Sequence, residues 1–155
     1  MRFSFVIVLA CCIVGLHAAT AFKPIFAMHG ISSGHRDWDR FSQFVSKHHP
    51  GTVFVALPVY EVVRSYVSLR EQVNGIIRFI SNITNSQPEV YGQGYHLVCH
   101  SQGALLCRCI AQEWDEHKIS ALLSLAGPQA SARHRLCALF IFVSPNRSAC
   151  SIKFG

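Results

Sequence analysis

Short apolar runs alternate with helical patterns over most of this chain of 155 residues. The runs are bounded by turn residues, which predicts buried strands at residues 23–30, 52–57, 95–99 and 119–126. Between them, apolar side chains recur every three or four positions, which predicts helices at about residues 37–48, 68–83 and 101–116. Strands that alternate with helices indicate βαβ units with right-handed crossovers. The expected fold class is therefore α/β with a mostly parallel sheet.

The predicted helices have defined faces and ends. The second helix begins with a capping box, in which Ser68 accepts from a first-turn amide and Glu71 reaches back to the chain before it. Its apolar face consists of Leu69, Val73, Ile76, Ile77, Ile80 and Ile83, and that of the first helix of Trp38, Phe41, Phe44 and Val45. Residues 58–66 and 85–94 lack a clear period and are expected to be loops.

The alternation stops after Gln129. Residues 130–135 are small and basic, and residues 138–143 are apolar. The apolar segment fits one more buried strand, and it fits equally well an apolar tail with nothing to pack against. We therefore expect a partial α/β domain at residues 22–129 and a divergent basic and apolar tail at residues 130–155.

The first 21 residues have the pattern of a signal peptide. Arg2 precedes an apolar run of about 14 residues, which is shorter than the ~20 needed to span a bilayer. Ala19-Thr20-Ala21 then provides a small-x-small cleavage signature. An uncleaved buried helix is the alternative, and no other segment is long enough to cross a membrane. The pattern places the chain in the secretory pathway.

Composition favours a folded, mildly basic protein. Half of the residues are hydrophobic and 14% are charged, so a substantial core can form. Loss of Arg2 with the signal peptide lowers the formal net charge from +6 to +5. No basic patch interleaved with aromatic residues accompanies this charge, so nucleic acid is not an expected partner.

Five cysteines remain after the signal peptide, so at least one thiol is unpaired within the chain. Cys99 and Cys107 fall on a predicted strand and helix, where free cysteines are expected to behave as small hydrophobic residues. Cys107 and Cys109 lack metal-ligand spacing, and neither a metal site nor a cofactor is expected. Two sequons mark Asn82 and Asn146 as candidate glycosylation sites, although such triplets also occur by chance.

Residues 94–108 combine a short strand, a tight turn and the start of a helix, with Ser101 at the turn. Such a turn forces the serine into a strained backbone conformation that exposes its hydroxyl above the sheet. The flanking positions must be small: Gly103 meets this demand fully and Cys99 less well. Cys-x-Ser-x-Gly is thus a variant of the nucleophile elbow, and Ser101 is the candidate nucleophile.

Two backbone N–H groups are candidates for an oxyanion hole. One belongs to Gln102, directly after the nucleophile and at the positive end of its helix. The other belongs to Ile31, which follows His29-Gly30 in the loop after the first strand, where Gly30 lets the backbone turn close to the substrate. An ordinary strand-to-loop turn is the alternative interpretation of His29-Gly30.

The sequence provides no credible base and acid for a triad. This class of fold delivers serine, acid and histidine in that order. The acids after Ser101 lie at the far end of its own helix, ~18–20 Å away. Those acids are Glu113, Asp115 and Glu116, and His117 shares their position. His100 is expected to face away from the serine, and His134 has no acid after it. The earlier histidines are expected to be surface or loop residues: His29, His35, His48 and His49.

The segment Cys99-His-Ser-Gln-Gly-Ala-Leu-Leu-Cys-Arg108 resembles the palmitoyl-protein thioesterases, and the lysosomal second type more than the first. That type also has cysteine in place of the first elbow glycine and a cysteine–arginine pair after Ser-Gln-Gly. Shorter stretches agree in order: residues 23–25 with His29-Gly30, residues 49–53, residues 71–73 and residues 124–129. The resemblance covers about residues 22–129.

The resemblance implies the N-terminal part of an α/β-hydrolase fold that is incomplete at its C-terminus. It implies hydrolysis of fatty acyl thioesters, of S-acyl cysteine or acyl-CoA, by Ser101, with Ile31 and Gln102 at the oxyanion-hole positions. It also implies a glycosylated lysosomal protein, with an extracellular location as the alternative. Ala104 stands for a family glycine, and after Gln129 the family's lid, acid and histidine are not recognisable. The alternative function is therefore a truncated, catalytically incompetent form. Acyl-chain length, disulfide pairing and oligomeric state stay open.

Overall fold

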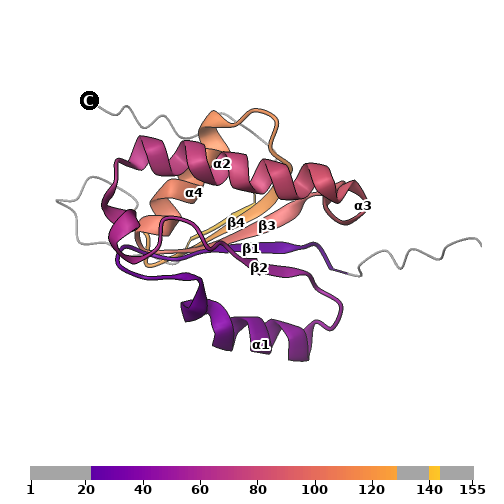
Figure 1. Ribbon diagram of the computed structural model, residues 1–155. Coiled ribbons are helices and arrows are strands. Elements are labelled where there is room, and N and C mark those ends of the chain that lie inside the picture. Colours follow the sequence, from indigo (N-terminus) through magenta and orange to yellow (C-terminus); the bar gives the residue numbers. More distant parts are fainter. Residues whose placement is uncertain (1–21, 129–139, 144–155) are drawn as a thin grey trace, which may run out of the picture.

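The computed structural model describes residues 22–128 and the backbone of residues 140–143. Its centre is a five-stranded sheet of order β2-β1-β3-β4-β5 (Figure 1). The strands are β1 (Ile25–Met28), β2 (Phe54–Ala56), β3 (Tyr95–His100), β4 (Ile119–Leu125) and β5 (Phe140–Val143). The first four strands are mutually parallel, and β5 runs antiparallel to β4. The predicted α/β class and the predominantly parallel sheet are confirmed.

Helices cover both faces of this sheet. They are α1 (Asp39–His48), α2 (Leu69–Ser86), α3 (Pro88–Tyr91) and α4 (Gln102–Glu113), with 3₁₀ turns η1 (His35–Trp38) and η2 (Val62–Tyr66). Figure 1 shows α2 and α4 on one side of the sheet and α1 on the other. This arrangement follows from the chain order, because each parallel strand pair needs a crossover over one face.

Side chains alternate between the two faces and divide the core into two clusters. Phe26 and Leu97 point to the α2 and α4 side, whereas the neighbouring Ala27 and Val98 point to the α1 side. The larger cluster lies on the α2 and α4 side. It contains fully buried side chains of β1, α2 and α4, namely Met28, Ile76, Ile80, Leu106 and Ile110. Two well-covered faces explain why the strands read as continuous apolar runs in the sequence.

The predicted amphipathic face of α2 is confirmed. Val73, Ile76 and Ile80 are buried, and the other predicted positions on this face are partly buried against the same cluster. The capping box is only half formed: the Ser68 hydroxyl accepts from the Glu71 N–H at 3.2 Å. The Glu71 carboxylate instead turns toward Arg64 of η2, whose guanidinium carries the opposite charge. Glu71 Oε1 lies 4.0 Å from Arg64 Nη2.

Three local predictions are wrong. Phe44 is 55% exposed, because α1 buries Val45, η1 buries Trp38, and Phe44 packs only against the rings of Phe41 and His48 on the same helix. The two predicted loops each contain a helical turn, η2 and α3. Pro88 at the first position of α3 favours that turn, since proline needs no N–H there.

Beyond residue 128 the structure describes only β5. This strand pairs with β4, and Ile141 lies opposite Leu123. Of the two alternatives for the apolar segment at 138–143, the strand is the one found. The predicted signal peptide and the remainder of the predicted tail lie outside the described residues.

Candidate active site

Ser101 lies at a sharp turn between β3 and α4, as the elbow pattern predicts. Its φ of 53° and ψ of −123° place it in a region that non-glycine residues rarely adopt. The turn is held on both sides: the Ser101 N–H donates to the Leu125 carbonyl at 2.9 Å, and the Ala104 N–H donates to the Ser101 carbonyl at 3.0 Å. The hydroxyl thus projects from a position fixed by both the sheet and the helix.

Glycines bring three backbones into contact around this serine. A Cβ on Gly103 would lie 2.3 Å from the His29 carbonyl oxygen, so α4 packs directly on the end of β1. A Cβ on Gly30 would lie 3.0 Å from the Ser101 Cβ, so the loop after β1 passes beside the nucleophile position. Side chains at either position would separate these segments, which explains the two glycines physically.

The structure corrects the expectation for Cys99 and Cys107, which form a disulfide across the elbow with their Cα atoms 6.6 Å apart. Cys99 is the second-last residue of β3 and Cys107 lies on α4, so the bond ties together the strand and the helix on either side of Ser101. Cys109 is the free, buried cysteine of the described region, and burial raises the pKa of its thiol. Cys137 and Cys150 lie outside the described residues.

The two predicted oxyanion-hole residues lie at the same edge of the sheet, because β1 and β3 are parallel neighbours. Ile31 follows Gly30 in the loop after β1, and Gln102 is the first residue of α4. Among the described residues, neither backbone N–H donates a hydrogen bond. For Gln102 this is expected, since the first N–H groups of a helix have no acceptor within it. The oxyanion-hole role of these two groups stays a prediction.

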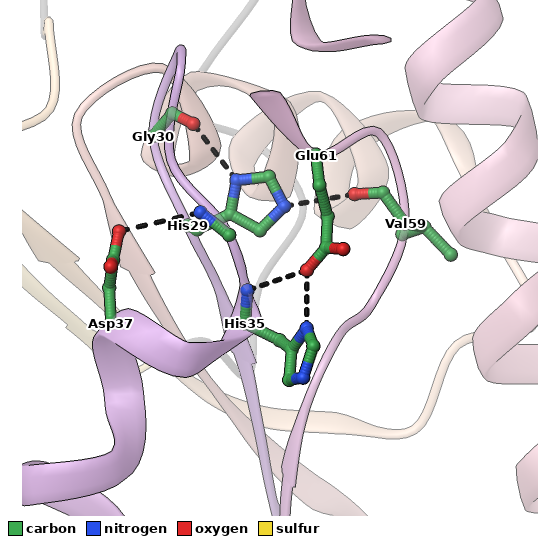
Figure 2. Close-up of polar contacts among 7 residues, drawn as sticks. His29, Gly30, His35, Asp37, Val59 and Glu61 are labelled. Atoms are coloured by element: carbon green, nitrogen blue, oxygen red, sulfur yellow. Dashed lines mark hydrogen bonds and ion pairs between the residues drawn. The ribbon is translucent and has the colours of Figure 1, made fainter. Parts of the chain in front are cut away.

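The loop after β1 is fastened to the segment Glu61–Tyr66, a contact that the sequence did not predict. The Glu61 carboxylate accepts from the His35 N–H at 2.7 Å and also pairs with the His35 ring (Figure 2). The Val62 N–H donates to the Ser33 carbonyl at 2.9 Å. Donation from the His35 backbone and then from its ring lowers the pKa of Glu61, so this carboxylate stays ionised.

His29 is a buried residue in the loop directly after β1, so the expected loop position is confirmed although the side chain does not reach the surface. Its side chain is 2% exposed. Figure 2 shows the ring between two carbonyl oxygens, with Nδ1 2.9 Å from that of Gly30 and Nε2 2.9 Å from that of Val59. The ring therefore links the loop after β1 to the segment after β2.

No histidine among the described residues hydrogen-bonds to the Ser101 hydroxyl. His117 is engaged at the far end of α4, where Nδ1 accepts from the Ile119 N–H and Nε2 donates to the Ala111 carbonyl, each at 3.1 Å. Glu113 forms an ion pair with Arg70. His134 lies outside the described residues.

The pair His35 and Glu61 is a histidine–carboxylate contact that the sequence reasoning missed, because it weighed only acids that follow the serine. Both residues precede Ser101, so chain order gave no signal for them.

A cavity of about 350 Å³ opens beside the elbow on the α1 side of the sheet. His100 and Leu125 line it from the ends of β3 and β4, and Trp38, Arg40 and Phe41 line it from η1 and α1. His100 thus borders this cavity together with Gly30, and its orientation away from the serine stays a prediction. Within the part of the chain that the structure covers, no group of three potential metal ligands comes together.

Asn82 of the first sequon is exposed on α2, and Asn146 lies outside the described residues. Among the described helices, none combines the length and apolar character that a membrane span requires.

The sequence is similar to a known protein family and to several of its members. Residues 24–151 match the family model described as palmitoyl protein thioesterase. The lysosomal thioesterase PPT2 of Rattus norvegicus is 33% identical over 109 residues, which are 70% of this chain and 35% of that protein. The human protein of the same name is 32% identical over the same shares. The lysosomal thioesterase PPT2 homolog of Drosophila melanogaster is 28% identical over 115 residues, 74% of this chain and 38% of that protein. The chain thus spans about a third of the length of these relatives.

Two solved structures share the fold. An extracellular alpha/beta-hydrolase from a Paenibacillus species has a TM-score of 0.54 at 14% identity, over 68% of this chain and 41% of that one. A monoacylglycerol lipase from Paleococcus ferrophilus has a TM-score of 0.54 at 17% identity, over 69% of this chain and 39% of that one. At this identity the likeness concerns the fold alone, and it confirms the α/β-hydrolase architecture.

Proposed function

Because the chain belongs to the palmitoyl protein thioesterase family, we propose that it is a serine hydrolase of fatty acyl thioesters, with Ser101 as nucleophile. The observation that carries the proposal is the backbone of Ser101, at φ 53° between β3 and α4, with the Gly30 loop passing beside it. Acyl transfer needs an exposed serine at such a strained turn and two backbone N–H groups nearby without an acceptor, for which Ile31 and Gln102 are the candidates.

In this proposal the Ser101 hydroxyl attacks the carbonyl carbon of an S-acyl cysteine or an acyl-CoA. Negative charge then develops on the carbonyl oxygen, and the N–H groups of Ile31 and Gln102 donate to it. Each such donor lowers the barrier by roughly 3–4 kcal/mol. The carbon–sulfur bond breaks as the thiol leaves, and water releases the fatty acid from the acylated serine.

A thioester suits a site whose general acid is not identified. The leaving thiol has a pKa of about 8.5, so the thiolate departs without full protonation, unlike an amine or an alkoxide. The site therefore needs help mainly in activating the serine and in stabilising the oxyanion.

The second candidate function is a catalytically incompetent form in which Ser101 has no triad acid and histidine. It is favoured by one observation: in the described residues the Ser101 hydroxyl has no histidine partner. Such a form would at most bind an acyl chain or a partner protein.

We further propose a lysosomal location, by similarity to relatives whose names state it, with secretion from the cell as the alternative. This location requires entry into the secretory pathway through the predicted signal peptide at residues 1–21. The exposure of Asn82 makes it accessible to glycosylation there, and Asn146 stays a sequence-based candidate.

A fluorophosphonate probe distinguishes the two functions. The purified chain is incubated with the probe, digested and analysed by mass spectrometry, beside Ser101→Ala and a matched Ser86→Ala variant at the exposed end of α2. The hydrolase proposal expects a phosphonate adduct on Ser101 in the wild type and in Ser86→Ala, and none in Ser101→Ala. A wild-type chain that stays unlabelled at Ser101 would support the incompetent form.

A further inference from the structure

Ser65 is a buried polar residue in the second half of η2, with 2% of its surface exposed. It precedes the nucleophile by 36 positions and belongs to a segment that the sequence marks only as a loop. Both its hydroxyl and its carbonyl oxygen accept hydrogen bonds from the two segments that carry the proposed oxyanion-hole donors.

The hydroxyl holds the loop after β1. The Ser32 N–H donates to the Ser65 Oγ at 2.8 Å, while the hydroxyl proton is directed to the Val62 carbonyl oxygen. Ser32 is in the left-handed region, at φ 58°, where a residue with a side chain is strained. Because the Ser32 N–H belongs to the peptide that directly follows Ile31, this bond restricts how the Ile31 backbone can turn.

The carbonyl oxygen of Ser65 holds the other segment. It accepts from the side-chain amide of Gln102 at 3.1 Å and from that of Gln72 at 3.0 Å. Gln72 is 1% exposed and also donates to the Val67 carbonyl at 2.8 Å, so it anchors η2 to the start of α2. The residue whose backbone N–H opens α4 is therefore tied by its own side chain to Ser65.

We propose that Ser65 is a positioning residue that sets the distance between the two oxyanion-hole N–H groups. This inference rests on the proposed function, since it presumes that Ile31 and Gln102 stabilise an oxyanion. Ser65 binds the loop after β1 through its hydroxyl and the start of α4 through its carbonyl oxygen, and the side chain of Gln72 holds the same carbonyl in place. Donors aimed at a developing charge must be held within about 0.5 Å, which a surface loop without such a brace does not achieve.

The test compares Ser65→Ala with the conservative Ser65→Thr, which keeps a hydroxyl. The control is Ser68→Ala, which removes the N-cap of α2 and so weakens the same region without touching either segment of the oxyanion hole. The rate of fluorophosphonate labelling of Ser101 is measured per folded molecule. Ser101 of Ser65→Ala should be labelled about 10- to 100-fold more slowly, which is less than the roughly 100- to 1,000-fold loss caused by removing an oxyanion-hole donor altogether. Ser65→Thr and Ser68→Ala should be labelled at rates within about threefold of the wild type. Equal rates for Ser65→Ala and Ser68→Ala would overturn the proposal.

Amide hydrogen exchange tests the geometry independently of any chemistry. The Ser32 N–H should be protected in the wild type and in Ser68→Ala, and should lose protection in Ser65→Ala while the amides of α4 keep theirs. Unchanged protection of Ser32 would contradict the inference. If the wild type is not labelled at all, the proposed function fails and the positioning role fails with it, whereas a selective loss of protection at Ser32 then shows only that the Ser65 hydroxyl holds the loop after β1.

Discussion

Replacing Gly103 by alanine tests the close approach of α4 to β1 on which the elbow depends. A Cβ at this position would lie 2.3 Å from the carbonyl oxygen of His29 and 2.8 Å from that of Met28. Both atoms belong to the backbone of the sheet, so no side-chain rotation can relieve the contact. The helix has to move away from the strand, and Ser101 moves with it.

Two opposing terms give the magnitude. Alanine is favoured over glycine inside a helix by up to about 1 kcal/mol. Overpacking of a closely packed contact costs about 1–3 kcal/mol, and a contact this short falls at the upper end. The free energy of unfolding should therefore fall by about 2 kcal/mol. The sign is informative, because helix propensity alone predicts stabilisation.

The assay is urea unfolding followed by circular dichroism, with Gly51→Ala as the control. Gly51 has φ +88° and nothing within 4 Å of an added Cβ, so its replacement carries only the left-handed backbone cost of about 1–2 kcal/mol. Gly103→Ala should also slow the labelling of Ser101, whereas Gly51→Ala should not. A Gly103→Ala protein as stable as the wild type would refute the packing that the structure shows.

Three further predictions concern the ties around the site. Ser68→Ala should lower the free energy of unfolding by about 1 kcal/mol in urea, because the N-cap of α2 loses its acceptor. Reduction of the Cys99–Cys107 disulfide, which closes a loop of sequence separation 8, should lower it by about 2–3 kcal/mol; an equal unfolding midpoint with and without reductant would contradict the bond. Hydrogen bonds from His35 lower the pKa of Glu61 in the folded state below its ordinary value of 4.5. The pairing with His35 therefore stabilises the protein at pH values above 4.5, and this stabilisation is lost as the pH falls through the pKa of the folded state. The difference in free energy of unfolding between wild type and Glu61→Gln should thus be constant above pH 4.5 and shrink below that pH. A difference that increases as the pH is lowered would contradict this.

The alternation of strands and helices could be predicted from the sequence because both faces of the sheet are covered. Strands such as β3 then appear as uninterrupted apolar runs, and α2 shows a clear period because only one of its faces meets the sheet. The predicted strain at Ser101 is likewise found, since a strand followed at once by a helix leaves few backbone paths. The roles of Ser101, Ile31 and Gln102 stay predictions.

The supports of the site could not be predicted, because they depend on contacts between distant segments. The bond from Ser32 to Ser65 joins residues 33 positions apart, and no periodicity marks either of them. The same holds for His29, whose burial follows from two carbonyl oxygens that only the fold brings to its ring. Cys99 and Cys107 were expected to be free because strand and helix positions gave no sign that their side chains meet.

The most direct test of the central claim is acylation of the chain by a long-chain acyl-CoA. The protein is mixed with palmitoyl-CoA, thiol release is followed continuously, and the quenched digest is searched for an acyl group on the peptide that contains Ser101. We predict thiol release from the wild type accompanied by acyl transfer to Ser101, and neither in Ser101→Ala. Equal thiol release by the two proteins, or an acyl group on any other residue, would contradict the assignment of Ser101 as the nucleophile.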